Sequence, residues 1–152
     1  MRRIILILMI LLIPTMLYAE QIGIKVGGMS FDNFNGGYLV NGAEIDLDYW
    51  TPNLQFQFVM EDTQGDFSLF SLTPGLKYNF PSNTLSPYIG GGIGLFIVDN
   101  KYSATGRALS AGIEPKLTDR ISLFIELKFN FVRIKSIDYS GKSICWGLRW
   151  LL

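Results

Sequence analysis

The sequence predicts an all-β fold for residues 20–152: an eight-stranded antiparallel up-and-down β-barrel that crosses a membrane. Two observations come from the residue pattern: alternation of apolar and polar residues recurs almost to the last residue, and no stretch after residue 19 shows sustained helical periodicity. A third is that the connections alternate between mostly short and mostly longer ones. This arrangement is typical of a meander with tight turns at one end and loops at the other.

The first 19 residues have the features of a secretory signal peptide. Arg2 and Arg3 precede an apolar run over residues 4–12, and Ala19 closes the segment. A membrane-anchoring helix is the alternative, but Pro14 interrupts the run, which is shorter than the roughly 20 residues that a spanning helix needs. We therefore expect residues 1–19 to be a signal peptide cleaved after Ala19, and residues 20–152 to form one barrel domain.

Composition narrows the possible functions. The chain has 13 basic and 13 acidic residues, so no basic field is present to attract nucleic acid. The single cysteine, Cys145, cannot form an internal disulfide. No histidine is present, which removes the commonest general base and the commonest metal ligand among side chains. The sequence therefore predicts no catalytic residue, no cofactor and no metal site, and the protein is not expected to be an enzyme.

The first four strands follow from alternation. A strand is predicted over residues 22–30, and the next two, over 44–49 and 54–61, form a hairpin around residues 51–53. The fourth covers residues 70–80. Longer connections are predicted over residues 32–42 and 62–66.

The last four strands are predicted over residues 88–97, 108–117, 121–131 and 143–152. The seventh shows the clearest alternation and has the 9 to 11 residues that a tilted strand needs to cross a bilayer. Tight turns are predicted over residues 81–86 and 118–120, and loops over 99–106 and 133–142. Pro74 and Pro115 fall inside predicted strands, where each removes a hydrogen-bond donor.

The apolar face is predicted to point outward, toward lipid. Small glycines lie on the polar face, which suits a crowded barrel interior, and the apolar face carries no charge except near a loop, as at Arg107. Aromatic residues gather at the short-turn end, as in an interfacial girdle; they are Tyr49, Trp50, Tyr78, Phe80, Tyr88 and Trp150. A soluble lipocalin-like binding barrel, with the apolar face inward, is the alternative.

Three segments, SPYIGGGIGLFIV, GIEPKLTDRISLFIELKFNF and the C-terminal strand, carry a family resemblance. Over its whole mature length the chain resembles the OmpA/OmpX-like family of small eight-stranded outer-membrane β-barrel proteins. The resemblance implies the outer membrane of a Gram-negative-type cell, with its lipid as a partner. It also implies that Gly147, Trp150 and Leu152 form the signal read by the barrel-assembly machinery, although phenylalanine is most typical where Leu152 stands.

Charged residues of the polar face are the candidate functional residues. They are predicted to form an ion-pair lattice that fills the interior, with the residues Lys25, Glu44, Asp46, Asp48, Glu61, Lys77, Glu114, Lys116, Glu126, Lys128 and Arg149. Arg149 and Lys128 are expected to share Glu126 and the acidic strand, with Tyr88 among them. A metal site on the three acids of residues 44–48 is disfavoured, because calcium prefers six to eight oxygens from flexible loops.

The predicted function is that of a monomeric structural or surface-interaction protein with a plugged lumen. Loops around Phe34, Tyr38, Tyr102 and Tyr139 would face outward toward a possible extracellular partner. A small transport or lipid-handling barrel is the alternative.

Overall fold

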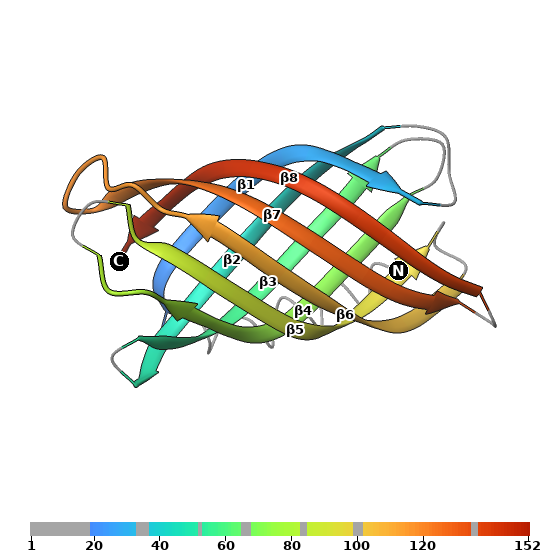
Figure 1. Cartoon of the computed structure of the whole chain (residues 1–152), viewed down its shortest axis with the longest axis horizontal. Helices are drawn as coiled ribbons and strands as arrows, with labels where there is room; N and C mark the ends of the chain where they lie inside the picture. Colours follow the sequence, from blue (N-terminus) through green and yellow to red (C-terminus); the bar gives the residue numbers. More distant parts are fainter. Residues whose placement is uncertain are drawn as a thin grey trace.

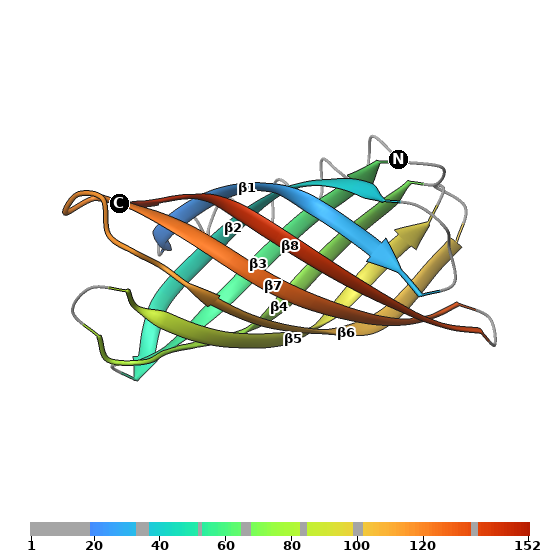
Figure 2. The ribbon, with the colours of Figure 1, turned by 45° about the horizontal axis from the view of Figure 1, so that its top comes forward.

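The computed structural model describes residues 19–32, 37–51, 53–64, 68–82, 85–98, 102–134 and 137–152. These residues form one closed barrel in which every strand pairs with its neighbours in the chain and β1 pairs with β8 (Figures 1 and 2). The strands are β1 (Ala19–Phe31), β2 (Tyr38–Thr51), β3 (Leu54–Gln64), β4 (Leu69–Asn79), β5 (Pro87–Val98), β6 (Tyr102–Ile113), β7 (Ile121–Ile134) and β8 (Ile137–Leu151). Within the described ranges, no helix is long and apolar enough to cross a membrane.

The strands are tilted, and the pairing register gives the stagger. A row of facing residues that starts at Ile22 on β1 returns to β1 at Asp32, ten residues further along; it passes through Ile45, Phe58, Pro74, Ile93, Arg107, Phe131 and Ser140. Its step from Pro74 to Ile93 follows from the flanking pairs Leu72–Leu95 and Gly75–Gly92. Closure with this stagger requires strands inclined to the barrel axis, as the ribbon shows (Figure 1). Neighbouring strands thus present their side chains at successively different heights along the axis.

The side-chain orientation agrees with the predicted transmembrane barrel. Large apolar residues such as Ile93 and Ile144 are 68% and 63% exposed on the outer face, whereas Lys77 and Arg149 are 1% exposed inside. A soluble lipocalin-like barrel would have these two faces reversed, so that alternative is wrong. Of the aromatic residues predicted at the short-turn end, Tyr78 and Phe80 are exposed and in edge-to-face contact, but Tyr88 points inward and is 1% exposed.

Strand ends differ from the sequence-based boundaries at both ends of the barrel. At the loop end β2 already begins at Tyr38 and β6 at Tyr102, so the loops are shorter than predicted. At the turn end β6 stops at Ile113 instead of residue 117, because Pro115 has no N–H to donate to a ladder. The Glu114 amide instead donates to the Leu85 carbonyl at 2.8 Å.

Pro74 lies inside β4 and is accommodated by a local gap in pairing. It faces Phe58 in the continuous β3–β4 ladder, whereas the β4–β5 pairing is interrupted between Leu72 and Gly75. The missing N–H therefore affects only the side toward β5.

Candidate functional site in the barrel interior

The interior near the short-turn end contains an arginine surrounded by acids and aromatic rings. Arg149 on β8 forms ion pairs with Glu44 and Glu114, and its Nε lies 3.9 Å from Asp46 Oδ2. Its guanidinium also lies 4.8 Å from the ring centre of Tyr88 and 4.1 Å from that of Phe124, within cation–π range.

Lys77 completes this layer. Its ammonium pairs with Asp46 and lies 4.0 Å from Glu114 Oε2. Strands from opposite sides of the barrel thus contribute charges to one compact group, which we call the outer ion layer: Glu44, Asp46, Lys77, Glu114 and Arg149. Pairing offsets the cost of removing these charges from water.

A second group lies further from the short turns. Lys25 Nζ is 2.8 Å from Glu61 Oε1 and 2.9 Å from Glu126 Oε1, and Lys128 Nζ is 2.6 Å from Glu61 Oε2. The Tyr88 hydroxyl donates to Glu126 Oε2 at 3.2 Å. We call Lys25, Glu61, Glu126 and Lys128 the inner ion layer; Tyr88 contacts both layers.

The structure brings together most of the lattice residues chosen from the sequence, with two differences. Glu126 pairs with Lys25 and not with the expected Lys128 or Arg149. Lys128 pairs with Glu61, and Arg149 pairs with Glu114 and, as expected, with Glu44 of the acidic strand. Lys116 was expected inside but is exposed at the rim, because β6 ends before Pro115 and Lys116 forms only an isolated bridge with Ser122. The side chain of Asp48 lies outside the described residues.

Charge in this interior is close to balanced. In the described part, five carboxylates face four cations: Glu44, Asp46, Glu61, Glu114 and Glu126 against Lys25, Lys77, Lys128 and Arg149. No group of three or more histidine, cysteine or acidic side chains there is arranged to hold a metal ion.

Sequence reasoning missed an apolar layer that fills the interior at the loop end. Its buried residues come from β1, β2, β4, β5, β7 and β8: Met29, Phe31, Tyr38, Val40, Leu69, Phe96, Val132 and Cys145. The expectation that Tyr38 faces outward from a loop is wrong: it is 3% exposed and contacts Phe31 edge to face. Among the other loop residues named from the sequence, Tyr102 is exposed, Tyr139 is half-buried, and Phe34 lies outside the described residues.

A signal for this layer is present in the sequence. In β1 and β2 the inward positions change from charged to apolar toward the loops, as in Lys25 to Met29 and Glu44 to Val40. The sequence-based prediction does not include this layer because Tyr38 and Val40 fall in the connection predicted over residues 32–42, and Phe31 and Val132 lie just beyond the predicted strand ends.

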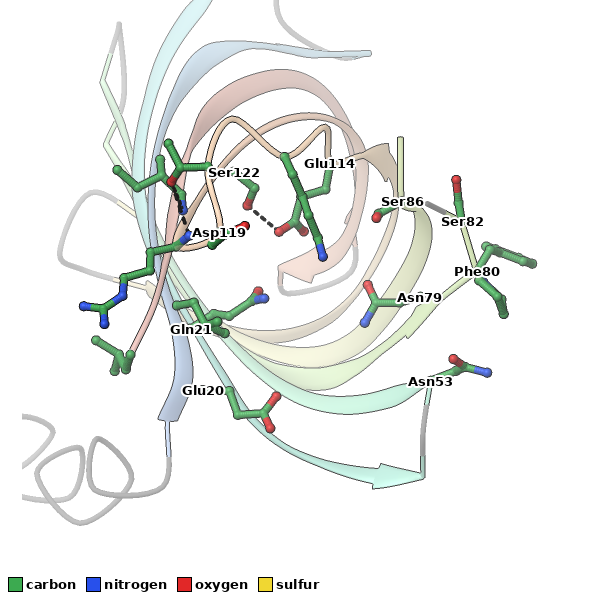
Figure 3. Close-up of a pocket in the computed structure, with 17 residues that line it drawn as sticks. Glu20, Gln21, Asn53, Asn79, Phe80, Ser82, Ser86, Glu114, Asp119 and Ser122 are labelled. Atoms are coloured by element: carbon green, nitrogen blue, oxygen red, sulfur yellow. Dashed lines mark hydrogen bonds between the residues drawn. The ribbon is translucent and has the colours of Figure 1, made fainter. Parts of the chain in front are cut away.

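The short-turn end contains a polar recess of about 500 Å³ (Figure 3). Glu20, Gln21, Asn53 and Asn79 lie around it, and Ser122 donates to Glu114 Oε1 at 2.5 Å on its inner side. The outer ion layer, which includes Glu114, therefore borders the recess.

The terminal strand closes the barrel. Trp150 faces Ile22 on β1 and Ile121 on β7, and the Leu152 amide donates to the Glu20 carbonyl at 2.9 Å. Leu152 is 69% exposed, whereas Gly147 is buried, and a Cβ added to Gly147 would lie 2.0 Å from the Ile24 carbonyl oxygen. Only glycine allows β1 and β8 to approach this closely here.

Comparison with solved structures confirms the predicted fold. Neisserial surface protein A is similar with a TM-score of 0.72 and 15% identity, covering 87% of this chain and 95% of that one. The N-terminal β-barrel domain of OprF from Pseudomonas aeruginosa gives a TM-score of 0.60 at 13% identity, with 85% and 98% covered. The outer-membrane enzyme PagL gives 0.57 at 16% identity, with 84% and 97% covered.

These similarities place the chain in one structural class. Its fold is that of the small eight-stranded outer-membrane barrels of the OmpA/OmpX type, as the resemblance in the sequence implied. No protein-family model and no curated protein matches the sequence.

Proposed function

We propose that the protein is an outer-membrane β-barrel that acts as a structural or surface-interaction protein, with a plugged lumen and outward-facing loops. The observation that carries this proposal is the filling of the interior by the two ion layers and the apolar layer. Eight strands enclose a space that side chains can fill, so no continuous water path is needed to satisfy the buried charges.

The proposed location depends on export and assembly. A signal peptide cleaved after Ala19 would release the chain from the inner membrane, and Gly147, Trp150 and Leu152 would be read by the barrel-assembly machinery. The outward apolar face would then contact outer-membrane lipid in a monomeric barrel.

We also propose that the protein is not an enzyme. One structurally similar protein, PagL, is an enzyme, but fold similarity alone does not transfer an activity. This chain has no histidine to act as a general base.

Planar-bilayer conductance of refolded residues 20–152 tests the plugged lumen. We expect no stable single-channel steps, while a general porin in the same bilayers conducts. Reproducible steps from the wild-type protein would overturn the proposal.

The alternative is a small transport or lipid-handling barrel, and the recess of about 500 Å³ is the observation that favours it. A passage would have to displace both ion layers and the apolar layer. Stable conductance would support the transport form of this alternative.

A further inference from the structure

Arg107 lies at an unusual place on the outer surface. It is exposed on the outward face of β6, where its cross-strand neighbours are Ile93 and Phe131, 68% and 46% exposed. Among the described residues no acidic side chain forms an ion pair with Arg107. An arginine on a lipid-facing surface is costly near the bilayer centre and tolerated near the interface.

The height of Arg107 along the barrel follows from β7. Ile121 and Phe131 are ten residues apart on the same outward face, which corresponds to roughly 25 Å along the axis for a strand tilted by about 40°. The apolar band of an outer-membrane barrel is about 25 Å tall. Phe131 then marks the loop-side boundary of this band. Arg107 faces Phe131 from the preceding strand, and because rows of facing residues rise toward the loop end from β1 to β8, Arg107 lies about 3 Å inside this boundary, where its long side chain can reach lipid headgroups.

A second cation flanks the same aromatic surface. Lys142 on β8 faces Phe129, two residues from Phe131, and its side chain also points outward. Its ammonium is 3.6 Å from Asp32 Oδ1, and both side chains are more than half exposed. Arg133 lies nearer the loop and already forms an ion pair with Asp138 at 2.8 Å.

We propose that Arg107, assisted by Lys142, binds the phosphate of an anionic lipid headgroup in the leaflet at the loop end. The inference rests on the proposed membrane location. The guanidinium can donate two parallel hydrogen bonds to phosphate oxygens, and Lys142 adds a point charge on the far side of Phe129 and Phe131. Asp32 repels anions on the β1 side of Lys142, which directs the phosphate toward Arg107.

Lipid retention in nanodiscs tests this proposal. Wild type, Arg107→Gln and the matched control Arg120→Gln are reconstituted in phosphatidylcholine containing a minority of phosphatidylglycerol, and bound lipid is counted by native mass spectrometry. Arg120 is exposed at the opposite end of the barrel. We expect wild type and Arg120→Gln to retain phosphatidylglycerol, and Arg107→Gln to retain about fivefold less.

Equal retention of phosphatidylglycerol by all three proteins would overturn the inference, and so would an equal loss in Arg120→Gln. A change from dimer to monomer in Arg107→Gln would also overturn it, because a second copy of the chain would then cover the arginine. Displacement of the lipid by inorganic phosphate would also contradict it, since a free anion would then be the ligand. Thr105→Asp, which adds a carboxylate two residues away on the same exposed face, provides a second variant and is expected to lower retention. Failure of the wild type to enter nanodiscs would instead refute the proposed membrane function.

Discussion

Replacing Lys25 by methionine should strongly destabilise the barrel. The Lys25 ammonium is fully buried and lies 2.8 Å from Glu61 and 2.9 Å from Glu126. Glu61 keeps Lys128 at 2.6 Å in the variant. Among the described residues, Glu126 keeps only the hydrogen bond from the Tyr88 hydroxyl. One buried carboxylate is therefore left without a cation.

Removing one partner of a buried ion pair costs about 3 to 5 kcal/mol. With a urea dependence of about 2 kcal/mol per molar, the unfolding midpoint should fall by roughly 2 M. The assay is urea unfolding of the refolded protein in detergent, followed by tryptophan fluorescence. Lys116→Met is the matched control, because Lys116 is exposed and its loss should leave the midpoint unchanged.

The asymmetry of the inner ion layer provides a sharper test. Glu126→Leu leaves Lys25 paired with Glu61 and equalises the five carboxylates and four cations, so it should cost less than Lys25→Met. The double variant should recover part of the loss caused by Lys25→Met. An unchanged midpoint for Lys25→Met would refute the assignment of charges to the interior, and a larger loss for Glu126→Leu would refute this asymmetry.

Three further predictions concern the closing strand and the loop end. Gly147→Ala should lower the urea midpoint, because its Cβ would lie 2.0 Å from a backbone oxygen, whereas Gly28→Ala, whose nearest such atom is 4.0 Å away, should not. The hydrogen bond from the Ser140 hydroxyl, and after it the charge of Lys142, lower the pKa of Asp32 from 3.8. The stability that this carboxylate contributes is therefore present above about pH 4 and is lost as the pH falls through the pKa of Asp32 in the folded protein. Ser140→Ala should therefore raise the Asp32 pKa in an NMR titration, and an unchanged pKa would contradict the hydrogen-bond explanation. Deleting residues 150–152 should abolish membrane insertion, measured by heat-modifiable gel mobility; normal insertion would exclude a role in assembly.

Alternation was sufficient to predict the strand number and the facing of most side chains. It works because a strand side chain can point only inward or outward, and the seventh strand, β7, shows both faces clearly. Strand ends were less predictable. Tyr38 and Val40 point inward on β2 with the apolar Leu39 outward between them, so polar–apolar alternation does not mark this strand end, and Pro115 ends β6 earlier than the alternation predicts.

The partners within the lattice could not be predicted from the sequence. Which cation meets Glu126 depends on the stagger of the barrel, which sets the relative heights of strands that are not neighbours. β1 and β7 are separated by β8, yet Lys25 and Glu126 meet inside. Sequence alternation identifies which side chains point inward, but it contains no information on how high each side chain lies along the barrel axis.

The apolar layer beneath the loops has a consequence for how the protein can vary. Met29, Val40, Phe96 and Val132 seal the lumen on strand residues, so the seal does not depend on the connecting segments above them. We therefore expect the connecting segments to tolerate changes in length and composition without exposing the ion layers to water. The barrel can therefore serve as a scaffold on which foreign loop sequences are displayed, and its resistance to unfolding should be nearly independent of the inserted sequence.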